Sequence, residues 1–331
     1  GMVILANALP CQLWGARILR LWMDIMPGEA AGPGTVFAAS FIVVSPTCLL
    51  TGLMFPLAVH VAAHEKDRPL ARLYVLETIG FAAGGLLFTF VFADHIHAFR
   101  IALGAALFAL GGAAILLRPG LIRGCAVTLL LLFAIMTLYP RVPDMLERRS
   151  IDARWRAAGF LGAQASGARL VASRDTRYQN LAVIASGGQY DVFADGETAF
   201  SFPDPYTYEH YVHFIMAQRT DAQKILVIGG NPLGMIPELL RYPVLKRLVY
   251  VVPDPGMAGV LQGVAADDWH AIASDPRVAI SACDGPRFLM TNRESYDVVI
   301  SCAPEPATAC ANRYFTREYF AAASRALTPH G

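Results

Sequence analysis

The sequence predicts a multi-pass α-helical membrane region, followed by a small antiparallel β-sheet and an α/β domain built on a parallel sheet. Composition is the first indication, because 55% of the 331 residues are hydrophobic and only 16% are charged, which is too apolar for an average soluble domain. Distribution is the second, because the long apolar runs lie between residues 34 and 139. The third is an alternation of strand and helix patterns after residue 220, typical of a parallel sheet.

Four apolar segments approach or exceed the ~20 residues needed to cross a hydrocarbon core of ~30 Å. They lie within a membrane region of residues 1–140, at 35–62, 73–93, 99–117 and 121–139. The stretch 2–23 carries Arg17 and Arg20 on one helical face, so it fits either a truncated span or an interfacial helix. Glu77 lies one turn inside the second apolar run, where it either has a function or extends to the interface. We expect a multi-pass protein of the cell membrane that contacts the lipid bilayer.

The basic residues that flank the spans give conflicting indications of orientation. Charges in the short loops, such as Lys66, Arg68 and Arg118, favour placing the soluble part outside the cell. An arginine cluster after the last span favours the cytoplasm; its members are Arg141, Arg148, Arg149, Arg154 and Arg156. We expect the cytoplasmic orientation, with residues 141–168 as a linker.

Charge and cysteine content exclude two classes of function. A formal net charge of +1 leaves no basic face for nucleic acid, so no nucleic-acid partner is expected. The six cysteines form no CxxC pair and show no metal-ligand spacing, which indicates buried free thiols and no metal site. The chain opens at Gly1 inside an apolar stretch and stops at "LTPHG", so we expect a fragment at both ends.

Residues 169–204 predict a small antiparallel sheet, because apolar and polar positions alternate between the turns "SGGQ" and "ADGE". A helix is expected at 208–219. Strands of a parallel α/β domain, residues 205–331, are expected at 225–229, 247–252, 278–282 and 296–301.

Residues suited to ligand binding follow each of these four strands. In chain order they are Gly229, Gly230 and Gly234; Asp254; Asp284 and Gly285; and the segment from Cys302 to Pro306. Any one of them also fits a turn or a helix cap. Because the carboxyl ends of parallel strands share one edge of the sheet, the four together predict a ligand site there.

These segments resemble the spermidine synthase family, the polyamine aminopropyltransferases. The resemblance rests on "YQNLAV", "DGETAFSFPDPYTYEHYVHF", "ILVIGGNPLG", "VVPDP", "DPRVAISACDGPRFL" and "YDVVISCAPEPATACANRYFTREYF", in family order and spacing. It covers roughly residues 35–331 and is closer to bacterial members with an integral-membrane N-terminal part. It implies a Rossmann-like domain of methyltransferase type, which is C-terminally incomplete here because the full sheet has seven strands.

The resemblance implies transfer of an aminopropyl group from decarboxylated S-adenosylmethionine to a polyamine such as putrescine. An amine attacks the methylene beside the sulfonium, and methylthioadenosine leaves. This chemistry needs in-line positioning, an acidic lining for the amine and a carboxylate that accepts a proton. It needs no metal, and it is compatible with a homodimer.

The resemblance also assigns roles to residues of this chain. It makes Tyr208 and Glu305 catalytic, and places Glu209, His210 and Glu305 at the polyamine. Cofactor binding falls to Gln179, Gly229, Gly230, Gly234, Asp254, Asp284 and Gly285. Tyr208 could instead have a packing or capping role. Gln179 could instead be a strand residue that faces solvent and has no role in binding.

Three departures from the family pattern weigh against activity. Cys302 stands where the family has its proton-accepting acid, Val252 where it has the ribose-binding acid, and Asn231 where it has a third glycine. Asparagine tolerates a positive φ better than most residues, so the last change is the mildest. Two alternatives therefore stay open: a degenerate adenosyl- or polyamine-binding domain that serves the membrane region, and an S-adenosylmethionine-dependent methyltransferase.

Overall fold

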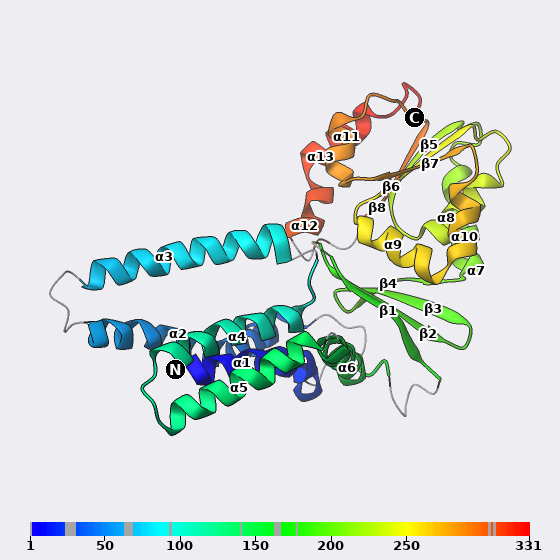
Figure 1. Ribbon diagram of the computed structural model, residues 1–331. Helices are drawn as coiled ribbons and strands as arrows, with labels where there is room; N and C mark the ends of the chain where they lie inside the picture. The colour runs from blue at the N-terminus through cyan, green and yellow to red at the C-terminus, as the bar shows by residue number, and fades with distance from the viewer. Residues whose placement is uncertain are drawn as a thin grey trace. The chain divides into compact units, whose positions relative to one another are not determined.

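The computed structural model describes residues 2–23, 31–62, 69–92, 95–139, 141–161, 167–176, 178–303, 306 and 309–331. Two compact units divide the chain, Gly1–Ser166 and Gly167–Gly331 (Figure 1). The division separates the apolar half of the sequence from the half of mixed composition.

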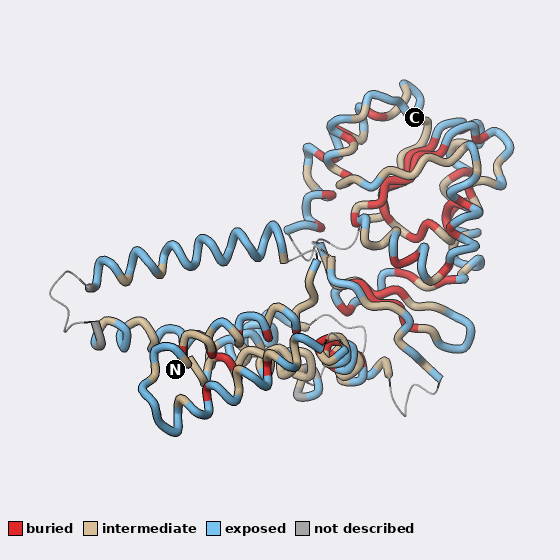
Figure 2. The backbone as a smooth tube through the Cα atoms, viewed as in Figure 1, coloured by how far each residue is buried: buried red, intermediate tan, exposed pale blue. Residues whose placement is uncertain are grey.

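The first unit is helical, as predicted. Its elements are α1 (Met2–Ile18), η1 (Leu19–Trp22), α2 (Pro33–Ala62), α3 (Pro69–Leu87), the π-helical η2 (Phe88–Phe92), α4 (Ala98–Leu116), α5 (Leu121–Leu138) and α6 (Arg141–Ala157). Four stretches are long and apolar enough to cross a membrane: Pro33–His60, Leu70–Phe92, Ala98–Leu116 and Leu121–Leu138. They coincide with the four predicted apolar segments. Figure 2 shows α3 exposed along its length, which leaves apolar side chains such as Phe81 on the surface.

The core of this unit lies between α1, α4 and α5. Ala6, Leu103, Leu110 and Phe133 are buried together there. The Arg17 side chain of α1 donates to the Glu147 carboxylate and to the Ser150 hydroxyl. The N-terminal stretch is thus a packed helix whose last turn is held by α6.

Residues 141–157, predicted as part of a linker, form the helix α6 instead. Pro143, Glu147, Ser150 and Trp155 are its buried positions. The first three recur at the i, i+4, i+7 spacing of one helical face. Only one of the four is a strongly apolar side chain, and the many arginines between them hide the pattern.

The second unit begins with the predicted antiparallel sheet. Its strands run in the order β1 (Arg169–Asp175), β2 (Asn180–Ser186), β3 (Gln189–Ala194) and β4 (Glu197–Phe202). The two predicted glycine turns are present. Gly187 and Gly188 have φ of +59° and +87°, and Asp195 and Gly196 have φ of +53° and +91°, the backbone that tight hairpins require.

The helix expected at 208–219 is α7, Pro205–Met216, so both predicted ends were wrong by three residues. Asp204 caps it by accepting a hydrogen bond from the Thr207 amide, and Pro205 stands in its first turn. Proline is favoured there because its fixed φ suits a helix start.

A four-stranded parallel sheet forms the centre of the second unit. Its strands are β5 (Lys224–Gly229), β6 (Arg247–Val252), β7 (Val278–Ala282) and β8 (Val298–Cys302), in the spatial order β7-β6-β5-β8. The helices after them are α8 (Pro232–Leu240), α9 (Pro255–Val264), α10 (Ala266–Ala273), α11 (Gly285–Thr291), α12 (Ala309–Asn312), η3 (Arg313–Phe315) and α13 (Arg317–Arg325). The strand order reverses between β5 and β8. That reversal is the switch point at which sheets of this kind bind ligands.

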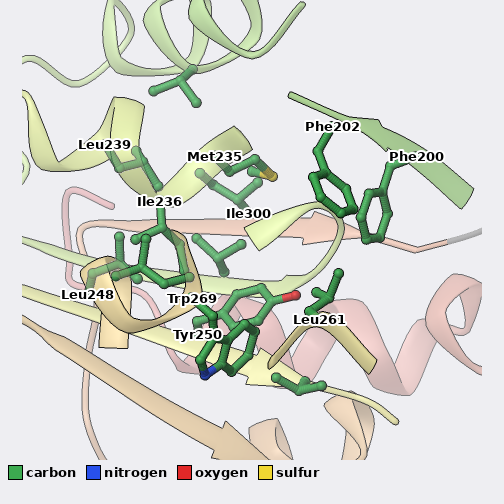
Figure 3. Close-up of a cluster of buried hydrophobic side chains, with 14 of the residues drawn as sticks. Phe200, Phe202, Met235, Ile236, Leu239, Leu248, Tyr250, Leu261, Trp269 and Ile300 are labelled. Carbon is green, nitrogen blue, oxygen red and sulfur yellow. The ribbon is translucent and has the colours of Figure 1, made fainter. Parts of the chain in front are cut away.

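Buried side chains join this sheet to its surroundings. One cluster contains Tyr250 from β6, Ile300 from β8, Trp269 from α10 and Phe202 from the antiparallel sheet (Figure 3). The strand ends are therefore carried on a packed scaffold.

All six cysteines are free thiols. The prediction that they are buried is wrong for Cys11, Cys48, Cys125 and Cys310, which are exposed. The first three lie on helices whose outward faces are apolar, so hydrophobic surroundings in the sequence did not mean burial in the chain.

Candidate active site

The carboxyl ends of β5 and β8 meet at the switch point, where Gly229 pairs with Cys302. Gly229 and Gly230 have φ of +71° and +75°. A Cβ at Gly230 would lie 2.8 Å from the Cys302 Cβ, and one at Gly229 would lie 3.0 Å from the Cys302 carbonyl oxygen. Backbone conformation and the contact with β8 therefore both require glycine here, independently of any ligand.

Asn231 fixes the start of α8 beside this turn. Its side-chain oxygen accepts from the amides of Leu233 and Gly234 at 3.0 and 3.2 Å, and its Nδ2 donates to the Ser201 carbonyl at 3.2 Å. Its φ is −84°, so the tolerance of asparagine for a positive φ is not used. The residue acts as a helix cap, which explains why glycine is not needed at this position.

Tyr208 of α7 lies at the same edge. Its ring covers Gly234, where a Cβ would come within 2.3 to 2.8 Å of three ring atoms. Burial raises the pKa of the Tyr208 hydroxyl, and a hydrogen bond with Asn231 partly offsets the rise. The hydroxyl is therefore protonated at neutral pH and suits positioning better than proton acceptance.

Cys302 presents a neutral group at the switch point. Burial raises the pKa of its thiol, although a hydrogen bond with Tyr211 acts in the opposite direction. Its Sγ lies 3.6 Å from the Met235 sulfur. A protonated thiol in these surroundings cannot accept a proton from an ammonium group.

The structure brings together two predicted cofactor residues, Asp254 and Gln179. One Asp254 oxygen accepts from the Thr176 hydroxyl at 2.8 Å and from the Gln179 amide at 3.2 Å. The other accepts from the Gly256 amide at 2.8 Å and so caps α9. Asp254 is only 4% exposed, and both its oxygens already have partners that link the β1–β2 connection to α9.

Asp284 forms an ion pair with Arg313, a residue that was not predicted from the sequence. The guanidinium donates to both carboxylate oxygens of Asp284, at 2.9 and 3.2 Å, the bidentate geometry of a strong pair. Asp284 also caps α11, and the next residue, Gly285, has no room for a Cβ beside Ile228 and Tyr314. An arginine in the segment after the fourth strand was the only sequence signal for this pair.

Val252, the residue at the ribose-binding position of the resemblance, is 1% exposed and belongs to the main core cluster. Its side chain is committed to packing and offers no hydrogen-bond acceptor. The sequence shows no acid at this position, and in the structure the position belongs to the hydrophobic core.

The two predicted polyamine residues of α7 lie on its exposed surface. Glu209 is 3.5 Å from Arg241 at the C-terminal end of α8, whereas the switch point lies at the N-terminal end of that helix. A ring nitrogen of His210 is 3.0 Å from the Tyr206 carbonyl oxygen. Neither side chain is brought to the strand ends. Glu305 falls outside the described residues.

Comparison with known proteins shows which family this part of the chain resembles. Residues 205–331 match the family described as "Spermine/spermidine synthase domain". The similarity to this family covers these residues of the second unit. The Gly-rich turn, Tyr208, Asp254, Asp284 and Cys302 all lie within this matched domain.

Relatives share sequence with longer or shorter parts of the chain. A polyamine aminopropyltransferase of Streptococcus pneumoniae is 35% identical over 138 residues, covering 41% of this chain and 48% of that protein. Polyamine aminopropyltransferase 2 of Streptomyces coelicolor is 26% identical over 335 residues, covering 96% and 56%. A solved spermidine synthase in complex with the transition-state analogue AdoDATO is 22% identical with a TM-score of 0.44, covering 48% and 55%. The chain spans about half the length of these curated relatives.

The matched domain therefore has an ordered backbone at the switch point and few free charges around it. Among the described strand-end residues, Asp254 is internally bonded, Asp284 is paired with Arg313 and Cys302 is neutral. Nor do three His, Cys, Asp or Glu side chains gather among the described residues as a metal site would require. The arrangement can hold a ligand through backbone and hydrogen bonds more readily than through charge.

Proposed function

We propose that this chain is a membrane-anchored aminopropyltransferase of the spermidine synthase type. It transfers an aminopropyl group from decarboxylated S-adenosylmethionine to a polyamine such as putrescine. One observation carries the proposal: the matched family domain has its Gly-rich turn at the switch point of a parallel sheet, where ligands of such sheets bind.

In the proposed reaction the chain's own residues mainly position the reactants. The amine nitrogen attacks the methylene beside the sulfonium, a C–N bond forms as the C–S bond breaks, and methylthioadenosine leaves with the electron pair. We assign the adenosyl moiety to the turn at Gly229 and Gly230, and the aminopropyl end to Gln179. Such positioning supplies a large share of the barrier reduction in a two-substrate reaction.

The proton released from the amine needs an acceptor other than Cys302, whose thiol is protonated. Glu305 is our candidate, because a carboxylate in this segment can accept that proton. Tyr208 then orients the amine through its neutral hydroxyl.

The residues at the strand ends can make some, but not all, of the contacts that an adenosyl group requires. Asp284 can accept from the adenine amino group only through lone pairs that it shares with Arg313. Val252 offers nothing to the ribose hydroxyls, which costs about 1.5 to 3 kcal/mol for each charge-assisted bond not made. Cofactor affinity is therefore expected to be lower than an acid at position 252 would allow.

The membrane part of the proposal rests on the four apolar helices and on their exposed side chains. Exposed phenylalanines and leucines on α2 and α3 are stable in contact with lipid and costly in contact with water. We place the second unit in the cytoplasm, on the side of the arginines of α6.

The test is release of methylthioadenosine from decarboxylated S-adenosylmethionine and putrescine by the full-length protein in detergent. The proposal expects release that depends on putrescine and falls in a Glu305→Ala variant. Release no greater from the native chain than from that variant would reject it.

A second function, binding without turnover, is favoured by the neutral thiol of Cys302 at the switch point. The domain would then bind an adenosyl ligand or a polyamine on behalf of the membrane unit. Saturable calorimetric binding of decarboxylated S-adenosylmethionine with no methylthioadenosine release would select this function over the first.

A further inference from the structure

One face of α6 carries four exposed arginines. Arg141, Met145, Arg148, Arg149 and Arg156 are all exposed, and at ~100° per residue they fall within an arc of about 100° on the helix. Among the described residues, no ion pair or side-chain hydrogen bond involves Arg141, Arg148, Arg149 or Arg156. These five residues are called the arginine face.

Acidic side chains outside this arc anchor α6 in the first unit. Glu147 accepts from the Arg17 side chain and, at 3.2 Å, from the Phe99 amide. Asp144 lies 2.9 Å from both His97 and Arg100. Two of the three acids of α6 are thus used in contacts with α1 and α4.

The remaining acid, Asp152, falls within the same arc as the arginines and is only half-buried. Four arginines against one aspartate leave this face with a formal charge of about +3.

The position of α6 in the chain indicates which kind of ligand lies near its positive charge. It begins at Arg141, directly after α5 ends at Leu138, and α5 is one of the helices long enough to cross a membrane. Figure 1 draws α6 nearly end-on while α4 and α5 run across the view, so α6 lies crosswise to these helices. A cluster of basic residues directly after a span lies near the lipid headgroups at that end of the span.

We propose that the arginine face binds the headgroups of anionic phospholipids in the leaflet at this end of α5. The inference rests on the proposed membrane insertion and not on the proposed catalysis. Guanidinium groups match phosphate oxygens in bidentate geometry, and a basic residue near an anionic surface contributes about a fivefold preference. Met145, 42% exposed within this face, adds an apolar contact with the acyl boundary.

The test measures which lipids the full-length protein retains. The chain is reconstituted into nanodiscs of phosphatidylcholine and phosphatidylglycerol, and the lipids that stay bound after release are counted by native mass spectrometry. The variant Arg148→Gln/Arg149→Gln removes two charges from the arginine face. A matched control, Arg317→Gln/Arg325→Gln, removes two exposed charges from α13 in the second unit.

The native chain is expected to retain phosphatidylglycerol over phosphatidylcholine, and the α6 glutamine variant to lose about tenfold of that preference. The control should keep it, and Arg148→Lys/Arg149→Lys should keep most of it, which excludes misfolding as the cause. An unchanged preference in the α6 glutamine variant, or an equal loss in the control, overturns the inference. A chain that does not enter nanodiscs also overturns it, while methylthioadenosine release measured in detergent judges the catalytic proposal separately.

Discussion

The two strands that meet at the switch point differ in what their ends provide. The end of β5 supplies backbone geometry, with two glycines at positive φ and an asparagine cap on α8. The end of β8 supplies a side chain, and that side chain is the neutral thiol of Cys302. The backbone part is tied to the packing of β8 and Tyr208, so it cannot change without strain. The chemical part is a single side chain, whose sulfur lies 3.6 Å from that of Met235.

The largest effect is expected from restoring an acid on the β8 side. Cys302→Asp places a carboxylate where the resemblance puts the proton acceptor, and general-base assistance contributes about 10² to 10⁴-fold in rate. We expect methylthioadenosine release to rise by about 10²-fold. Cys302→Ala, which also removes the thiol but adds no base, should leave the rate close to that of the native chain.

A folded Cys302→Asp protein with no gain in rate would contradict the role assigned to the side chain at position 302. It would mean that the lack of a carboxylate at position 302 does not limit the rate of the reaction.

The next effect tests the β5 side. Gly230→Ala forces a Cβ to within 2.8 Å of the Cys302 Cβ at a φ of +75°, and strain of this kind costs about 1 to 3 kcal/mol. The denaturant midpoint of the full-length protein in detergent is expected to fall accordingly. Gly263→Ala is the matched control, because Gly263 is helical and has no atom within 4 Å of its Cβ position. Equal effects in the two variants would contradict the role assigned to the turn.

A smaller effect, on cofactor affinity, is expected from removing the ion pair between Arg313 and Asp284. Arg313→Gln frees both carboxylate oxygens and removes a positive charge near the binding position of a cationic ligand. Affinity for decarboxylated S-adenosylmethionine should rise about fivefold, roughly 1 kcal/mol, measured by calorimetry. Arg317→Gln removes a nearby exposed charge that is not paired with Asp284 and should leave the affinity unchanged. An affinity that falls in Arg313→Gln would show that the arginine itself contacts the ligand.

The smallest effect concerns the opposite edge of the sheet. Burial disfavours ionisation of Asp297, but hydrogen bonds from the Lys224 and Gln223 amides outweigh it and lower the pKa of this carboxyl. Stability from Asp297 is therefore complete above its unfolded pKa of about 3.9 and is lost as the pH falls through the lower folded value. Between about pH 5 and pH 2, stability should fall less steeply in Asp297→Asn than in the native chain.

Much of the second unit could be predicted from the sequence, because strand patterns and turns are local. The glycine turns of the antiparallel sheet and the four parallel strands appear where apolar runs and glycines indicate them. The start of α7 was predicted three residues late, although Asp204 and Pro205 form a helix cap followed by proline. Helix α6 was missed because its buried positions include Glu147 and Ser150, which are stable there only through contacts with Arg17 and Phe99.

The candidate site could be predicted in place but not in detail. Strand ends share an edge whatever their side chains do, so Gly230, Asp254 and Asp284 were correctly expected along it. Asp254 is bonded to Thr176, which is distant in the sequence. Asp284 is bonded to Arg313, and no local sequence pattern indicates the direction of that side chain. The packing of Val252 into the core likewise follows from tertiary contacts.

We propose that the strand ends bind an adenosyl ligand although acids are absent from positions 252 and 302. Calorimetric titration of the full-length protein in detergent with decarboxylated S-adenosylmethionine measures this directly. Saturable binding, strengthened in the Arg313→Gln variant, is the predicted result. No saturable binding in either the native chain or that variant would contradict the account.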